Sequence, residues 1–322
     1  MKQHLVSSIA GVGLVLAATA ARAEVQAATF SSQALGREVS VALQLPPSYE
    51  SSPKRRYPVV YALHGLFEGA GFWERRGLAA ALDRLWATGK LPEFVLVAVD
   101  GGNSFYVNGA GGLYEDVVTR EAPPWVEAHY RVIPGREARA LWGVSMGGYA
   151  GLRIAFAHPE VFQAVATHSA MLLQKIPSRE DGAGRWHMEA FGKIFGDPID
   201  PAAWAAADPL ALSARADPRT APALRFDCGG QDRFGLYQGN QALHQRLEAR
   251  GVRHEFEILP GDHGYEYVLS VFEKGLRFLT DSGGYGAMHP PAPFGLPPAA
   301  PRQDKPGASL PVGRGGVRPR PL

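Results

Sequence analysis

The chain has 322 residues, of which 46% are hydrophobic and 20% charged, and its formal net charge is +2. This composition supports a sizeable hydrophobic core and excludes a chain that is disordered throughout. Residues 1–23 contribute +2 and residues 287–322 contribute +4, so the part between them is near −4 and gives no case for a nucleic-acid-binding surface.

Residues 1–23 have the pattern of a secretory signal peptide. Lys2 gives a positive start, residues 9–18 form an unbroken apolar run, and residues 21–23 read Ala-Arg-Ala, an A-x-A cleavage site. An N-terminal membrane anchor is the alternative, but the apolar run is about half of the ~20 residues that a spanning helix needs. We therefore expect cleavage after Ala23 and an exported protein, periplasmic or extracellular, without stable membrane insertion.

Residues 24–286 alternate between strand-like and helix-like runs. The alternation predicts one α/β domain with about eight mostly parallel strands flanked by helices and no large separate lid domain. The first two strands are expected to pair in antiparallel fashion, and residues 172–212 are expected to form a helical insertion over the site. Strands are predicted at residues 25–30, 38–45, 57–63, 94–99, 138–144, 164–168, 224–228 and 255–259, and helices at 78–87, 114–129, 146–157, 236–250 and 265–280.

Residues 287–322 hold ten of the 26 prolines and lack any helical or alternating apolar period, which predicts a disordered tail. The single cysteine, Cys228, cannot form an intramolecular disulfide, and we expect it to be a buried, inert thiol in a strand. Neither an H-E-x-x-H pattern nor paired C-x-x-C motifs occur, so no metal site is expected. The run at residues 109–112 falls short of a dinucleotide fingerprint, and no cofactor is expected.

Residues 143–148 read Gly-Val-Ser-Met-Gly-Gly and lie between a strand-like run and a helix-like run. A strand-to-helix turn of this kind forces Ser145 into a strained backbone and lifts its hydroxyl clear of the sheet, which requires small residues two before and two after it. Gly143 and Gly147 meet that requirement. The alternative is a glycine-rich turn with an incidental serine, so a base and an acid must be found elsewhere.

The base is predicted from where the histidines lie, since open α/β sheets carry their functional groups on loops beyond the carboxyl ends of strands. His263 follows the last predicted strand and precedes the last helix. His64 also follows a strand but precedes the serine, whereas α/β hydrolases run in the order serine, acid, histidine. His168 follows a strand too, but its neighbours suggest a structural loop. We favour His263 as the general base.

Two carboxylates are candidates for the acid near the strand at residues 224–228. Asp227 lies within that strand, whereas Asp232 lies in the loop beyond it, from which its side chain can reach the far nitrogen of an imidazole. Asp262 is a third candidate, but as the sequence neighbour of His263 it has difficulty forming a straight hydrogen bond to that ring. We favour Asp232.

Acyl transfer creates an oxyanion, which needs preorganised backbone N–H donors. One should be the N–H of Met146, directly after the serine and at a helix N-terminus. The second should come from the loop at residues 64–67, and we select Leu66. The alternative is that His64 and Gly65 only shape a turn.

Six segments in this order carry a resemblance to a known family: residues 63–65, 99–106, 143–149, 158–162, 228–232 and 260–263. On these segments the chain resembles the esterase-D-like family of α/β hydrolases, which includes S-formylglutathione hydrolases, feruloyl and acetyl xylan esterases, enterochelin esterases and mycolyltransferases. The resemblance implies an α/β-hydrolase fold, a triad of Ser145, Asp232 and His263, and oxyanion donors at Leu66 and Met146.

Residues 100–106 are similar to a loop that lines the active site in this family. The resemblance therefore makes Tyr106 and Trp73 candidate contacts for an acyl group or a sugar, with ordinary core or rim packing as the alternative. The chain departs from the lipases because it lacks His-Gly-Gly-Gly, and from the formylglutathione hydrolases because it carries an export signal. A cytosolic thioester substrate is thereby disfavoured.

The function expected from these features is an exported serine carboxylesterase that hydrolyses a small-molecule or carbohydrate-linked ester through an acyl-serine intermediate. One alternative is an acyltransferase that passes the acyl group to a sugar hydroxyl. Another is a non-catalytic binding module that keeps the hydrolase fold. No oligomeric state is predicted.

Overall fold

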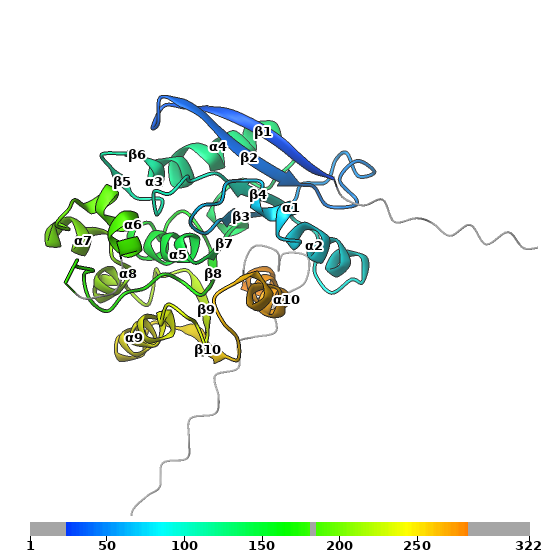
Figure 1. The fold of residues 1–322 in the computed structure, drawn as a ribbon. Coiled ribbons are helices and arrows are strands. Elements are labelled where there is room, and N and C mark those ends of the chain that lie inside the picture. Colours follow the sequence, from blue (N-terminus) through cyan, green and yellow to red (C-terminus); the bar gives the residue numbers. More distant parts are fainter. Residues whose placement is uncertain (1–23, 181–184, 283–322) are drawn as a thin grey trace, which may run out of the picture. The chain divides into compact units, whose positions relative to one another are not determined.

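An eight-stranded sheet with the order β1-β2-β4-β3-β7-β8-β9-β10 forms the centre of the fold in a computed structural model, which describes residues 24–180 and 185–282 (Figure 1). Strand β2 pairs antiparallel with β1 and β4, and all other pairs are parallel. The strands are β1 (Val25–Ser32), β2 (Arg37–Gln44), β3 (Val59–Leu63), β4 (Val95–Val99), β7 (Arg139–Val144), β8 (Ala164–His168), β9 (Ala223–Gly229) and β10 (His254–Leu259). Strands β5 (Asn108–Gly109) and β6 (Gly112–Leu113) form a separate small hairpin.

Strands β3 and β4 are apolar along their whole length because both faces of the sheet are covered. Side chains alternate between the two faces of a strand. In β3, accordingly, Val60 and Ala62 pack into one hydrophobic cluster, while Val59, Tyr61 and Leu63 pack into the other. The five residues of β3 are all buried. This explains why a continuous apolar run in the sequence predicted these two strands.

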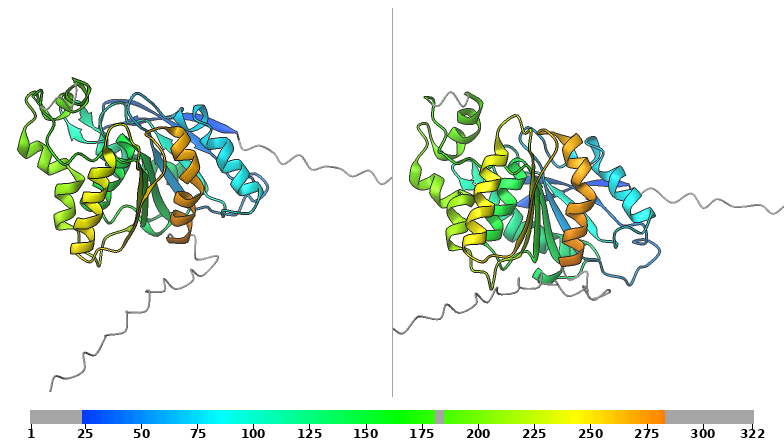
Figure 2. Two further views of the ribbon diagram at one scale, coloured as in Figure 1. Left: turned by 60° about the horizontal axis from the view of Figure 1, so that its bottom comes forward. Right: turned by 90° about the horizontal axis from the view of Figure 1, so that it is seen from below.

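Helices cover both faces of the sheet (Figures 1 and 2). One cluster takes in α1 (Phe72–Arg75), α2 (Leu78–Ala87) and α10 (Tyr265–Ser282), and the other takes in α4 (Ala122–His129), α5 (Met146–Ala157) and α9 (Leu236–Ala249). The shorter elements are α3 (Tyr114–Asp116), α6 (Arg185–Phe195), α7 (Pro201–Ala207), α8 (Pro209–Leu212), a π-helical turn at Val117–Glu121 and 3₁₀ turns at Arg136–Ala138 and Ser213–Arg215.

The predicted single helix over residues 114–129 is three elements: α3, the π-helical turn and α4. Pro123 and Pro124 explain the position of the last break, since proline lacks the N–H that an interior helical bond needs but is tolerated in the first turn. Both prolines lie in the first turn of α4.

The insertion at residues 172–212 is helical, as predicted, and forms α6, α7 and α8. Its aromatic side chains pack beside α5: Phe191 lies against Phe105, with ring centroids 4.2 Å apart, and against Trp204 at 5.0 Å. No described residue of 172–212 lines the cavity beside Ser145. The described part of this insertion therefore does not cover the site. It packs beside α5 instead, where the rings of Phe191 and Tyr149 have centroids 6.4 Å apart.

Two predicted segments, the signal peptide at 1–23 and the tail at 287–322, lie outside the described residues, and they stay predictions. Among residues 24–180 and 185–282, no helix combines the length and the apolar character of a membrane span.

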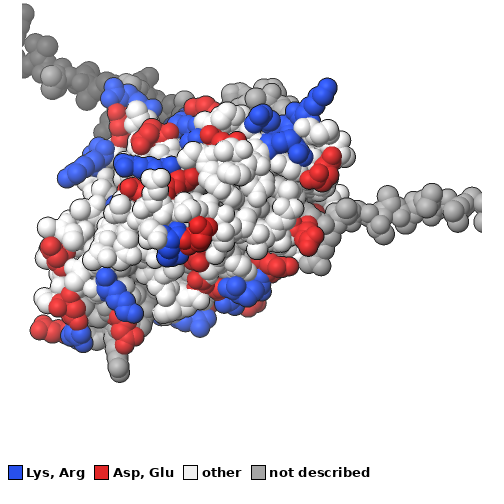
Figure 3. All heavy atoms as spheres, turned by 90° about the horizontal axis from the view of Figure 1, so that it is seen from above, with Lys and Arg blue, Asp and Glu red and all other residues white. Residues whose placement is uncertain are grey.

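On the face drawn in Figure 3, acidic and basic side chains are interspersed. The expectation that the chain does not bind nucleic acid likewise stays a prediction.

Candidate active site

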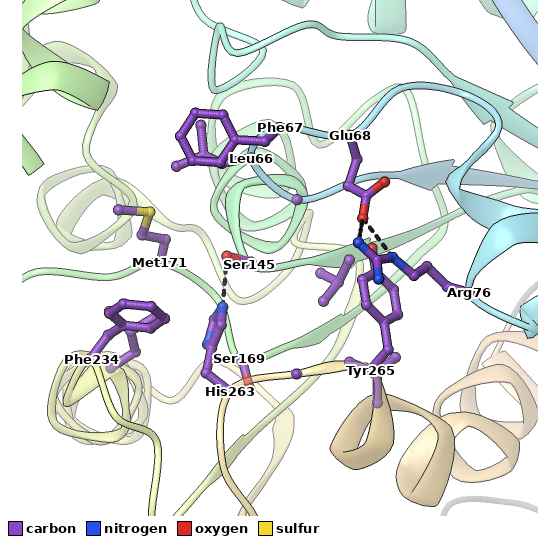
Figure 4. Close-up of a pocket in the computed structure, with 15 residues that line it drawn as sticks. Leu66, Phe67, Glu68, Arg76, Ser145, Ser169, Met171, Phe234, His263 and Tyr265 are labelled. Carbon is purple, nitrogen blue, oxygen red and sulfur yellow. Dashed lines mark hydrogen bonds and ion pairs between the residues drawn. The ribbon is translucent and has the colours of Figure 1, made fainter. Parts of the chain in front are cut away.

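Ser145 lies on the sharp turn between β7, which ends at Val144, and α5, which begins at Met146. Its backbone has φ 55° and ψ −111°, a conformation that is unfavourable for any residue with a side chain. The turn is held from behind, because the Ser145 N–H donates to the His168 carbonyl oxygen over 3.0 Å. The hydroxyl is thereby directed into a cavity (Figure 4).

The two glycines of the motif are required by close backbone contacts. A Cβ atom at Gly143 would lie 2.2 Å from the carbonyl oxygen of Gly147, and one at Gly147 would lie 2.1 Å from the carbonyl oxygen of Leu63. Gly65, on the neighbouring loop, passes so near Ser145 that its own Cβ would lie 3.5 Å from that of the serine. A side chain at Gly143 or Gly147 would displace the backbone around the hydroxyl, whereas a Cβ at Gly65 would make an ordinary van der Waals contact with Ser145.

The structure brings His263 and Asp232 to Ser145, as the sequence predicted. His263 Nε2 lies 3.1 Å from Ser145 Oγ (Figure 4). His263 Nδ1 lies 2.8 Å from Asp232 Oδ2. Because an ionised carboxylate only accepts hydrogen bonds, Nδ1 carries the proton and Nε2 offers its lone pair to the serine hydroxyl. Loops that follow β9 and β10 thus deliver an acid and a base to the turn that follows β7.

Asp232 is held in place on both oxygens. The Phe234 N–H donates to Oδ1 over 2.9 Å, and the Cys228 thiol donates to Oδ2 over 3.6 Å. The Asp232 side chain is 0% exposed, whereas that of His263 is 16% exposed. Burial raises the pKa of the Cys228 thiol, which agrees with the inert role expected of it.

A second histidine–aspartate pair lies within the sheet and has no access to the cavity. His168 Nδ1 lies 3.0 Å from both oxygens of Asp227, and both side chains are 0% exposed. The indole of Trp142 donates to His168 Nε2 over 2.9 Å, and Tyr267 donates to Asp227 over 2.8 Å. Every nitrogen of this imidazole is therefore used by the core.

The remaining alternatives are also occupied elsewhere. His64 donates from Nδ1 to the Gly65 carbonyl oxygen and accepts the Gly101 N–H at Nε2 over 3.0 Å. Asp262 accepts hydrogen bonds from the backbone N–H groups of Arg233 and His263 and pairs with the Arg233 guanidinium, which lowers the pKa of that carboxyl to about 2. Neither side chain reaches the imidazole of His263 through a hydrogen bond.

Two N–H groups of the loop after β3 are bonded away from the cavity. The His64 N–H donates to Tyr106 and the Phe67 N–H donates to Asn103 Oδ1 over 2.7 Å. Within the described part of the chain, the N–H groups of Gly65 and Leu66 have no acceptor, and both residues line the cavity. Met146 is the first residue of α5, where N–H groups lack an intrahelical partner. Both predicted oxyanion donors are therefore in a position to serve.

The prediction that Trp73 and Tyr106 contact substrate was wrong, and the packing alternative holds. Trp73 is 0% exposed, and its indole N–H donates to Gln44 over 2.7 Å. Tyr106 is 1% exposed; its hydroxyl donates to the Val99 carbonyl oxygen over 3.0 Å and accepts the His64 N–H over 3.1 Å. Neither lines the cavity, but Tyr106 holds the start of the loop that carries Leu66.

The cavity beside Ser145 measures about 400 Å³. Figure 4 shows apolar side chains, among them Met171 and Phe234, on one side of Ser145, and Glu68, Arg76 and Tyr265 on the other. The sequence reasoning missed these walls. The sequence did contain a signal for them. Met171, Phe234 and Tyr265 follow β8, β9 and β10 respectively, and the loops beyond the carboxyl ends of parallel strands are where His263 was also predicted to lie.

No site for a metal ion is evident in residues 24–180 and 185–282, where no three His, Cys, Asp or Glu side chains gather closely enough to hold one. The groups with chemistry at this cavity are thus a hydroxyl, an imidazole, a carboxylate and two backbone N–H groups. Such a set can transfer a proton, form a covalent bond to a carbonyl carbon and hold the resulting oxyanion.

Comparisons with known proteins agree with this arrangement. A family model described as "Putative esterase" matches residues 32–279. Esterase Rv1288 of Mycobacterium tuberculosis is 28% identical over 302 residues, which cover 85% of this chain and 61% of that protein. The S-formylglutathione hydrolase of Paracoccus denitrificans is 26% identical, with 79% of this chain and 91% of that protein covered.

The solved structure of a ferulic acid esterase superposes on this chain with a TM-score of 0.68 and 29% sequence identity. The superposition covers 82% of this chain and 99% of the esterase chain. The chain spans 61% of the length of the mycobacterial relative, and nearly all of the solved esterase. The matched family model extends over most of the chain, and the sheet order and flanking helices are those of an α/β hydrolase. The chain belongs to this esterase family and has the α/β-hydrolase fold.

Proposed function

We propose that the protein is a serine carboxylesterase that hydrolyses an ester through an acyl intermediate on Ser145. The observation that carries the proposal is the continuous hydrogen-bonded series Asp232–His263–Ser145, with the serine on a strained turn that opens on a cavity of about 400 Å³. Membership of the esterase family supports the same reaction.

In the first half of the reaction, His263 Nε2 takes the hydroxyl proton as Ser145 Oγ attacks the ester carbonyl carbon. Asp232 keeps the imidazole oriented and stabilises the imidazolium that forms. As the tetrahedral intermediate collapses, the bond to the alcohol oxygen breaks and His263 returns its proton to that oxygen. In the second half, water gives a proton to His263 and its oxygen attacks the acyl carbon, after which Ser145 leaves and regains the proton.

The oxyanion of both tetrahedral intermediates accepts hydrogen bonds from the N–H groups of Leu66 and Met146. Met146 adds the favourable end of the α5 helix dipole. Each such donor contributes about 3 kcal/mol to lowering the barrier.

The substrate is a small-molecule or carbohydrate-linked ester. The apolar side of the cavity accommodates an alkyl or aryl acyl group, and similarity to a ferulic acid esterase supports an aryl acid among the candidates. The protein is exported to the periplasm or beyond, an assignment supported by the charge, apolar run and cleavage pattern of residues 1–23. Export argues against a cytosolic thioester as the substrate.

Replacing Ser145 by alanine tests the proposal. We expect Ser145→Ala to abolish hydrolysis of p-nitrophenyl acetate and labelling by a fluorophosphonate probe, whereas Ser40→Ala, at an exposed serine on β2, should leave both intact. Turnover that persists in Ser145→Ala would refute the assignment, and failure of the wild-type protein to be labelled would favour a binding module. Product analysis with an added sugar acceptor identifies an acyltransferase, which would release transacylated product in preference to free acid.

A further inference from the structure

The cavity has two unlike walls on opposite sides of Ser145 (Figure 4). The apolar wall includes Met171 and Phe234 and needs no explanation beyond the acyl group of an ester. The other wall consists of Glu68, Arg76 and Tyr265, which take no part in the proton transfers described above. Polar groups that line a cavity without a role in the chemistry indicate recognition of a polar part of the substrate.

Glu68 is engaged by arginine on both carboxylate oxygens. Its Oε1 accepts the Arg76 Nε–H over 2.7 Å and is also paired with Arg76 Nη2, while its Oε2 is paired with Arg75 at 2.5 Å. The Glu68 side chain is only 7% exposed. The carboxylate therefore orients the Arg76 guanidinium, and Arg76 Nη1 is the end for which the described residues supply no acceptor.

Tyr265 offers a second donor at the same wall. Its ring lies below the Arg76 guanidinium, with 4.9 Å between the guanidinium carbon and the ring centroid. Its hydroxyl oxygen is buried and has no hydrogen-bond partner among residues 24–180 and 185–282. Buried hydroxyl groups in proteins almost always have a partner, so a buried hydroxyl at a cavity wall that lacks one indicates an acceptor supplied by a ligand.

The charge at this wall favours an anionic acceptor over a neutral one. The charged side chains that act on the Tyr265 hydroxyl are Glu68, Arg75 and Arg76, which together carry one net positive charge. The wall thus presents donors from Tyr265 and Arg76, a carboxylate already paired with arginine on both oxygens, and an excess of positive charge. A carboxylate can accept from both donors at once, and a charge-assisted bond to arginine is stronger than a neutral one.

We propose that Tyr265 and Arg76 form a subsite for a carboxylate group on the ester substrate, oriented by the Glu68–Arg76 ion pair. The inference rests on the proposed esterase function and names a substrate class for it: esters of which one half carries a carboxylate a few bonds from the reacting carbonyl. The carboxylate can belong to the acyl half or to the alcohol half of the ester.

Paired substrates that differ in the carboxylate test the subsite. Monomethyl succinate against methyl butyrate places the charge on the acyl half, and 4-acetoxybenzoate against 4-acetoxytoluene places it on the alcohol half. We expect kcat/KM for the carboxylate member to exceed that of its neutral partner at least tenfold in one pair. Raising the ionic strength should narrow that ratio, because salt screens the arginine charge.

Two variants identify the residues. Tyr265→Phe removes only the hydroxyl, and Arg76→Gln removes the positive charge together with the guanidinium donors. Each variant should reduce the carboxylate-to-neutral ratio of kcat/KM at least fivefold. Arg84→Gln is the matched control, because Arg84 is exposed on α2 and does not line the cavity, and its ratio should equal that of the wild type. A thermal unfolding curve for each variant shows whether the protein is folded, so that a reduced carboxylate-to-neutral ratio of kcat/KM can be attributed to the substituted side chain.

The outcomes separate the subsite from the esterase assignment. Hydrolysis of neutral esters without any advantage for a carboxylate, or a ratio that survives in both variants, would overturn the subsite and leave the esterase standing. A wild-type protein that hydrolyses neither member of either pair and resists fluorophosphonate labelling would overturn both.

Discussion

Replacing Tyr106 by phenylalanine removes one buried oxygen that joins β4 to the loop after β3. The aromatic ring remains, so no cavity forms, but the His64 N–H loses its only acceptor and the Val99 carbonyl oxygen loses a donor. An orphaned buried N–H costs about 1–3 kcal/mol. We therefore expect Tyr106→Phe to lower the free energy of unfolding by about 2 kcal/mol, which at roughly 2–4 °C per kcal/mol lowers Tm by about 4–8 °C.

The same substitution distinguishes a structural tyrosine from one that contacts substrate. If Tyr106 positions the loop that carries Leu66, Tyr106→Phe should lower both Tm and kcat. A substrate contact would instead raise KM and leave Tm unchanged. Circular dichroism melting and steady-state kinetics on p-nitrophenyl acetate measure these quantities. Tyr237→Phe, whose hydroxyl makes one exposed hydrogen bond, is the matched control. A Tm within about 1 °C of wild type for Tyr106→Phe would refute the reasoning.

Three further substitutions follow from the geometry. Gly147→Ala puts a Cβ 2.1 Å from the Leu63 carbonyl oxygen, so chemical denaturation should show a loss of about 3 kcal/mol, and an unchanged midpoint would contradict the close contact. Asp232→Asn should lower kcat about 10³–10⁴-fold, because the amide favours the wrong tautomer of His263; a loss below tenfold would exclude Asp232 as the acid. Asp208 caps α8 with both carboxylate oxygens, and burial raises its pKa, so its ionisation lowers the stability of the folded state. The melting temperature of Asp208→Asn relative to that of the wild type should therefore rise between about pH 4, below which the aspartate is protonated in both states, and pH 7. Equal melting temperatures for Asp208→Asn and wild type across this range would contradict that sign.

Much of the fold was predictable because an inner strand of a parallel sheet is buried on both faces. The run at β4, Val-Leu-Val-Ala-Val, has no polar position. Together with Phe94 it lies between two acidic residues, Glu93 and Asp100. The same regularity located the site. Parallel strands all end at one edge of the sheet, so the loops after β7, β9 and β10 must meet there, and Ser145, Asp232 and His263 lie on those loops.

The contacts of individual aromatic side chains were not predictable in this way. Trp73 belongs to a helix of four residues, and what it touches depends on Gln44 from a strand 29 positions earlier. Tyr106 lies on a segment with positive φ, where no periodicity indicates which way a side chain points. Tyr265 follows β10 and so could have been placed at this edge of the sheet, but its pairing with Arg76 forms only when two distant segments pack together.

The single cysteine, Cys228, is a natural chemical probe of the local stability of β9. Cys228 is 0% exposed on β9, the strand that leads to Asp232. A thiol reacts as an accessible thiolate, so a thiol reagent can modify it only when that strand opens. When the strand opens and closes much faster than the reagent reacts, the labelling rate reports the free energy of that opening. If a substrate analogue in the cavity slows the labelling of Cys228, the ratio of the two rates gives the increase in the free energy of opening of β9 that binding causes.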